Sequence, residues 1–93
     1  MAIFVGDTGT KIILDVGLDI STATLLQIKY QSPGGKSDSW TALQETTTMI
    51  SYITQENTLK EAGRWMLQAY VETPDWKRHG EIVVLEVEKI VGT

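Results

Sequence analysis

The sequence contains no cysteine, and it has only one histidine, one phenylalanine and two prolines among its 93 residues. The missing cysteines exclude disulfide bonds, thiolate metal sites and a cysteine nucleophile. One histidine without cysteine leaves too few ligands for a zinc site. No apolar run approaches the roughly 18 residues that a membrane-spanning helix needs. We therefore expect a protein with no cofactor, no metal and no membrane partner.

Basic residues are also scarce, because 8 lysines and arginines stand against 12 acidic residues, which gives a net charge of −4. Non-specific nucleic-acid binding needs clustered cations that neutralise phosphates. The one basic cluster, Lys77-Arg78-His79, lies beside Asp75 and Glu81, so we expect no nucleic-acid partner. The segment Met1–Val5 lacks the basic start and long apolar stretch of a signal peptide. Because small extracellular domains often depend on disulfides, the missing cysteines favour a domain made in the cytoplasm.

What the sequence does have is a period-two alternation of apolar and polar residues, the pattern of half-buried β-strands. Trp65, Leu67, Ala69 and Val71 fall on one face of such a strand, which makes Trp65 a core anchor. Residues 1–93 are expected to form a single all-β domain. About seven antiparallel strands at spacings of roughly 8–15 residues predict a β-sandwich or small barrel. The main strands are expected at Lys11–Val16, Leu26–Tyr30, Trp40–Ala42, Thr46–Thr54, Trp65–Val71 and Ile82–Val91.

Turn-forming residues separate these strands. Ser32–Lys36 combines a proline with two glycines and predicts a hairpin turn. Thr73–Asp75 and Gly80 bracket a second hairpin before the last strand. Asp19–Thr22 is interpreted as a turn in which side-chain oxygens accept hydrogen bonds from the backbone. Gly63 is expected to adopt a backbone conformation that a side chain would forbid.

Several segments, spread over nearly the whole chain, carry a resemblance to a known group of domains. They are Gly6–Thr10, Leu18–Thr24, Leu26–Tyr30, Ser32–Lys36 and Leu59–Ala69. In this order they resemble the Ig-like domains of tailed-phage and prophage structural proteins, including the N-terminal domain of baseplate upper proteins. Baseplate proteins continue into further domains, whereas this sequence stops at Thr93, so a stand-alone accessory piece is the alternative.

The resemblance implies an Ig-like β-sandwich with a structural, non-enzymatic role. The domain would belong to the capsid, tail, baseplate or fibre of a virion that is made in the bacterial host cytoplasm. Its partners would be other virion structural proteins and further copies of itself. Sandwich edges can pair with neighbours in such an assembly. The segments Ala2–Val5 and Ile82–Val91 are the candidate edges.

The tip of the second hairpin is the most specific candidate for a partner contact. There Trp76 follows Pro74-Asp75 and precedes Lys77 and Arg78. An exposed tryptophan beside arginine is the composition of an interface hot spot. The alternative is that Trp76 folds back over the edge of the sandwich, since edge strands need covering.

Two other functions leave traces in the sequence. A carbohydrate- or host-surface-binding module could stack sugars on Trp76, Trp40 and Tyr52 if these lay on one exposed face. A retropepsin-like aspartic protease is suggested by Asp7-Thr8-Gly9, and Ile90-Val91-Gly92 faintly resembles a second element of that family. The protease interpretation lacks an apolar residue before Asp7, because Gly6 stands there. We favour a plain turn at Asp7-Thr8-Gly9 and predict no catalytic residues.

The remaining polar residues give no clear site. His79 has no nucleophile motif near it and is interpreted as a solvated hairpin residue. The carboxylates Asp15, Asp19, Asp38 and Glu45 are scattered and do not follow the spaced-aspartate loop of a calcium-binding hand. A calcium site assembled between loops stays open at this point.

Overall fold

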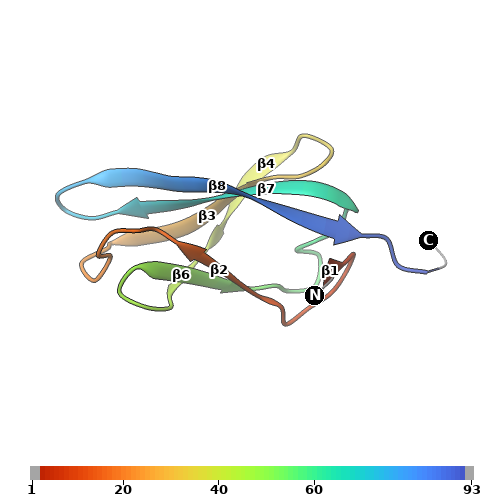
Figure 1. Ribbon diagram of the computed structural model, residues 1–93, viewed down its shortest axis with the longest axis horizontal. Helices are drawn as coiled ribbons and strands as arrows, with labels where there is room; N and C mark the ends of the chain where they lie inside the picture. The colour runs from red at the N-terminus through yellow and green to blue at the C-terminus, as the bar shows by residue number, and fades with distance from the viewer. Residues whose placement is uncertain (1–2, 92–93) are drawn as a thin grey trace.

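The computed structural model describes residues 3–91, and every regular element in that range is a β-strand, with no helix (Figure 1). β-Branched and aromatic residues, which strands prefer, are frequent in these elements. The strands are β1 (Ile3–Phe4), β2 (Lys11–Asp15), β3 (Leu25–Gln31), β4 (Ser37–Thr41), β5 (Leu43–Gln44), β6 (Met49–Ile53), β7 (Gly63–Glu72) and β8 (Lys77–Glu88).

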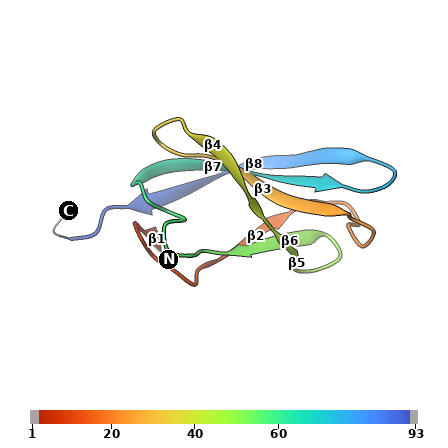
Figure 2. The same ribbon diagram turned by 180° about the vertical axis from the view of Figure 1, so that it is seen from behind.

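The strands form two sheets that pack face to face (Figure 1). One sheet has five strands in the order β1-β8-β7-β3-β4, and the other has three in the order β2-β6-β5. The chain changes layers at Ala42, which alone separates β4 from β5 and donates its N–H to the Leu26 carbonyl of β3 (2.9 Å). Figure 2 shows this crossing from behind. The predicted all-β fold is therefore confirmed at the level of two packed sheets.

The strand count differs from the prediction of about seven antiparallel strands. Eight strands are present, and β1 runs parallel to β8, with Ile3 beside Val87 and Phe4 beside Glu88. Two of the eight strands, β1 and β5, have only two residues each. A segment of two residues is too short to display an alternation of apolar and polar side chains. Such a strand can be recognised only from the partner strand to which it is hydrogen-bonded.

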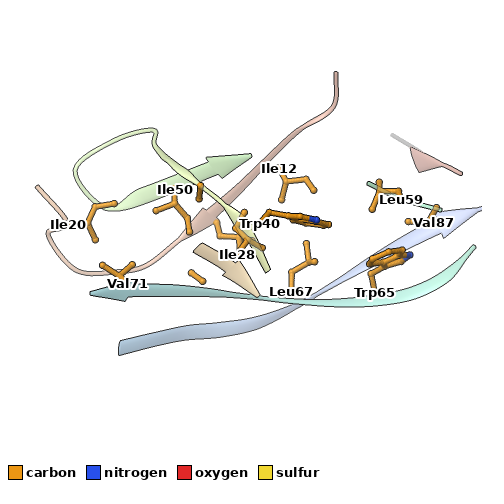
Figure 3. Close-up of a cluster of buried hydrophobic side chains, with 13 residues drawn as sticks. Ile12, Ile20, Ile28, Trp40, Ile50, Leu59, Trp65, Leu67, Val71 and Val87 are labelled. Atoms are coloured by element: carbon orange, nitrogen blue, oxygen red, sulfur yellow. The ribbon is translucent and has the colours of Figure 1, made fainter. Parts of the chain in front are cut away.

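The core lies between the sheets, where inward-facing residues of both layers meet (Figure 3). The predicted inward face of β7 is confirmed, since Trp65, Leu67, Ala69 and Val71 are all buried. On β8 the same alternation predicts Val83, Leu85 and Val87 as a core face, but only Val87 is buried and Val83 is 42% exposed. The opposite sheet has only three strands, so it does not cover the whole width of the five-stranded sheet.

Two of the predicted turns are confirmed. In the β3–β4 hairpin, the Ser32 N–H donates to the Lys36 carbonyl (2.8 Å), and the Gly35 N–H donates to the Ser32 carbonyl (2.9 Å). In the loop before β3, the Asp19 carboxylate accepts from the Ser21 N–H (2.8 Å) and hydroxyl (2.6 Å). These hydrogen bonds favour the charged carboxylate and lower the pKa of Asp19 below its ordinary value.

The predicted starts of two strands are wrong. The strand expected at Thr46–Thr54 begins only at Met49, because Thr46 closes a turn: its N–H donates to the Met49 carbonyl (3.2 Å) and its hydroxyl accepts from the Thr48 N–H (3.2 Å). The last strand does not restart after Gly80 but begins at Lys77. Gly80 lies within β8, at an irregularity of the β7–β8 ladder.

Candidate functional site

The β7–β8 hairpin tip carries the three residues predicted to contact a partner. Thr73 organises this turn: its hydroxyl accepts from the Asp75 N–H (3.2 Å) and the Trp76 N–H (3.1 Å), and its own N–H donates to the Trp76 carbonyl (2.8 Å). Trp76 is half-buried and packs against the core, whereas Lys77 and Arg78 are exposed. The tryptophan thus covers the end of the sandwich, and of the three predicted contact residues only the two cations are fully exposed.

The position of Trp76 changes the expected effect of removing it. Trp76→Ala is expected to lower the free energy of unfolding by about 1–3 kcal/mol, less than the ~3–5 kcal/mol of a fully buried aromatic residue. Lys77→Ala is the matched control, and its effect is expected to stay within about 0.5 kcal/mol because the side chain is exposed. Urea denaturation of both variants provides the measurement. Equal stability of the two variants would show that Trp76 does not contribute to the core.

The aromatic residues considered for sugar stacking do not form one exposed face. The Trp40 side chain is only 9% exposed. Its ring stacks on Tyr30 (centroids 4.6 Å apart) and on Tyr52 (4.9 Å), which lies in the opposite sheet. Both faces of the indole are therefore occupied by the protein's own rings. Trp40 is part of the core and is not available as a binding platform.

Asp7-Thr8-Gly9 lies in the connection between β1 and β2, outside any strand. The Asp7 carboxylate accepts from the Phe4 N–H (3.1 Å), and the Asp7 N–H donates to the Phe4 carbonyl (3.1 Å). Gly9 has a positive φ of 75° and donates its N–H to the Thr54 carbonyl (2.8 Å). The tripeptide thus lies in the connection between two strands, where Asp7 closes the turn at Phe4–Asp7. Gly92, the last residue of the second protease-like element, lies outside the described residues.

A small polar cluster occupies the outer face of the five-stranded sheet. The Lys29 ammonium lies 4.4 Å from the centroid of the Tyr70 ring and 3.5 Å from Nε2 of His79. The Tyr70 hydroxyl donates to the Glu72 carboxylate (2.6 Å), and this hydrogen bond raises the pKa of Tyr70. His79 is exposed, as expected, but it lies within β8, where its ring is 4.7 Å from that of Tyr70. The cluster combines a cation–π contact with a hydrogen bond on an exposed face.

The outer faces of both sheets expose large apolar side chains, which the sequence analysis did not single out. On the three-stranded sheet, Ile13 and Leu43 lie on either side of the buried Ser51, and Leu43 is 68% exposed. On the five-stranded sheet, Met66 pairs with Val84, and the neighbouring Ile82 is 63% exposed. Two runs in the sequence could have indicated these exposed apolar side chains, Ile12-Ile13-Leu14 and Ile82-Val83-Val84. In each run the alternation of apolar and polar residues is interrupted, so that apolar side chains lie on both faces of the strand.

Charged groups border the apolar part of the three-stranded sheet. Lys11 on β2 and Glu45, which follows β5, form an ion pair of 2.8 Å across β6. The hydrogen bond from Lys11, followed by one from the Ser51 hydroxyl, lowers the pKa of Glu45 below its ordinary value. Because the pair is exposed, its contribution to stability is small. It adds a polar border to the exposed Ile13 and Leu43.

The five-stranded sheet also has a shallow, open depression on its outer face. Its lining combines one basic and one acidic residue, residues with amide or hydroxyl groups, and three aliphatic residues. Among the lining residues are Lys29, Gln31, Ser39, Met66, Gln68 and Ile82. In the described part of the chain, no group of three or more histidine, aspartate or glutamate side chains is arranged to hold a metal ion.

The predicted edges for pairing with neighbours lie on one side of the five-stranded sheet, but they contact each other. Ile3 and Phe4 pair with Val87 and Glu88 within the same chain, and the Val5 N–H donates to the Glu88 carbonyl (2.9 Å). This part of the edge is therefore already occupied. Ala2 lies outside the described residues.

Residues 3–91 contain no helix that is long and apolar enough to cross a membrane. No protein-family model matches the chain, and no curated protein is significantly similar to it in sequence.

Proposed function

We propose that the chain is a non-enzymatic structural module of a tailed-phage virion, an Ig-like β-sandwich that assembles through protein–protein contacts. The order of the strands supports the Ig-like part of this proposal. In Ig sandwiches, the third, sixth and seventh main strands form one sheet, and the second, fifth and fourth form the other. With β2 taken as the second strand, β3-β7-β8 and β2-β6-β5 have this arrangement, and β4 extends the first sheet.

The observation that carries the assembly role is the pair of apolar outer faces. Monomeric soluble proteins seldom expose contiguous apolar patches, and larger ones mark contact sites. Here Ile13, Leu43 and Ile53 are exposed on one sheet, and Met66, Ile82 and Val84 on the other. A domain with exposed apolar residues on two opposite faces can be held between neighbours. That position suits a virion component, whose partners would be other structural proteins and further copies.

Co-expression with the products of the adjacent structural genes, followed by native mass spectrometry, tests this function. We expect a stoichiometric complex that Leu43→Lys weakens by about tenfold or more, since a charge replaces a buried apolar contact. Asp7→Asn is the control, and we expect it to leave the complex unchanged because Asp7 only closes a turn. Absence of the chain from purified virions, with no complex with any neighbour, would overturn the proposal.

A further inference from the structure

β8 has a long edge that only a few described residues of this chain cover. β7 pairs with β8 from Lys77 to Val87 on one side. On the other side, the described partners are Ile3, Phe4 and Val5, which bond only at Val87 and Glu88. Among the described strands, none pairs with this edge between Lys77 and Glu86. An exposed row of N–H and C=O groups of this length is a template for pairing with another strand.

The side chains at the centre of this edge are apolar on both faces of the sheet. Ile82 and Val84 point outward, while Val83 points inward opposite Leu67, and all three are exposed. An open edge strand usually carries charges at its centre to prevent pairing. Apart from Glu81, this strand carries its charges at the two ends.

The charges at the two ends have opposite signs. Lys77 and Arg78, followed by His79, stand at the start of β8, and Glu86 and Glu88 stand at its end. When two copies of this strand lie antiparallel, the basic start of one lies beside the acidic end of the other, and the apolar centres meet. Opposite charges across neighbouring strands stabilise a pair, and like charges destabilise it. The pattern is self-complementary only in the antiparallel arrangement.

We propose that β8 binds β8 of a second copy of this chain, antiparallel and around a two-fold axis at Val83. The five-stranded sheets of the two copies then form one continuous sheet. This inference deepens the proposed function, because it rests on assembly through protein contacts and names one partner, the chain itself. A two-fold interface uses the same surface on both subunits.

The register follows from which face each side chain occupies. Around Val83, Ile82 of one copy lies beside Val84 of the second copy, and both point outward. The ladder with β7 pairs Gln68 with Ile82 but Tyr70 with His79, so Gly80 and Glu81 together oppose one residue. Such a bulge shifts the alternation by one position. His79 therefore faces outward and lies opposite Glu86 of the second copy, just before the part of the edge that β1 covers.

A single cysteine at the axis tests this arrangement, since the chain has no cysteine of its own. Directly opposed Cα atoms of antiparallel strands lie about 4.5–5.5 Å apart, within the roughly 4.4–6.8 Å that a disulfide spans. Under mild oxidation, Val83→Cys is expected to form a covalent dimer at least about tenfold faster than Ile13→Cys, because the preformed pair raises the effective thiol concentration. Ile13 is the matched control, being 48% exposed on the other sheet.

The other outcomes of the cysteine experiment are also informative. Equal rates for Val83→Cys and Ile13→Cys would overturn the proposal, and so would faster cross-linking of Ile82→Cys or Val84→Cys, which would place the axis elsewhere. Ile82→Lys in an otherwise native chain should convert the dimer to a monomer in sedimentation, whereas Leu43→Lys should not. A failed cross-link with an intact complex between the chain and its virion neighbours rejects only this inference. A dimer without any such complex rejects the proposed function instead.

Discussion

Replacement of Trp40 by alanine is expected to lower the free energy of unfolding by about 3–5 kcal/mol, the cost of truncating a buried aromatic residue. The ring of Trp40 lies between Tyr30 of its own sheet and Tyr52 of the opposite sheet, with centroid distances of 4.6 and 4.9 Å. It also lies 6.4 Å from Trp65. Figure 3 shows Trp40 in the core between the two layers. Its loss therefore removes buried area and separates the rings that join these layers. Stacked pairs add about 0.5–1.5 kcal/mol each beyond burial.

The effect should be large relative to the whole domain. A domain of this size has a total stability of about 5–15 kcal/mol, so Trp40→Ala is expected to lower the Tm by roughly 15 °C or more. Trp40→Phe keeps one ring of the stack and should lose about half as much. Urea and thermal unfolding followed by circular dichroism measure both variants. If Trp40→Ala costs no more than Trp76→Ala, which removes a half-buried ring, the stack does not hold the layers together.

The parts of the fold that depend on local chemistry could be predicted from the sequence. The inward face of β7, the Ser32–Lys36 turn and the turn at Asp19 all depend on residues within a few positions of one another. The backbone of Gly63 belongs to the same group, since its φ is positive, at 130°. Period-two patterning and turn chemistry act within a segment, so the segment alone contains the signal.

The parts that depend on the other layer could not be predicted. Val83 points toward the inside of the sandwich but remains exposed, because its burial depends on the width of the opposite sheet. The two-residue strand β5 exists only because it pairs with β6. Trp76 could have served an interface or covered the sandwich, and the sequence around it is the same in both cases. For the candidate site, the sequence indicated the hairpin-tip residues Trp76, Lys77 and Arg78. It did not indicate the exposed apolar faces, because their residues come together only when the strands pair.

Replacement of Gly63 by alanine is the second change from which we expect a large loss of stability. Gly63 begins β7 with a φ of 130°, a conformation that L residues rarely adopt and that costs about 1–3 kcal/mol. A Cβ at this position would also lie 2.9 Å from Cγ and 3.0 Å from Cβ of Pro33. Overpacking of this kind adds about 1–3 kcal/mol. We therefore expect Gly63→Ala to lose about 3 kcal/mol or more, as measured by urea denaturation.

Two further variants separate the backbone contribution from the contact with Pro33. Gly17 also has a positive φ, of 78°, but an added Cβ there would meet nothing within 4 Å, so Gly17→Ala should show only the backbone cost of about 1 kcal/mol. Pro33→Gly removes both crowded carbons and should recover about 1 kcal/mol or more of the Gly63→Ala loss in a double-mutant cycle. Additive effects in that cycle would show that Pro33 does not constrain Gly63. The contact would then not explain why the β3–β4 turn and the start of β7 approach so closely.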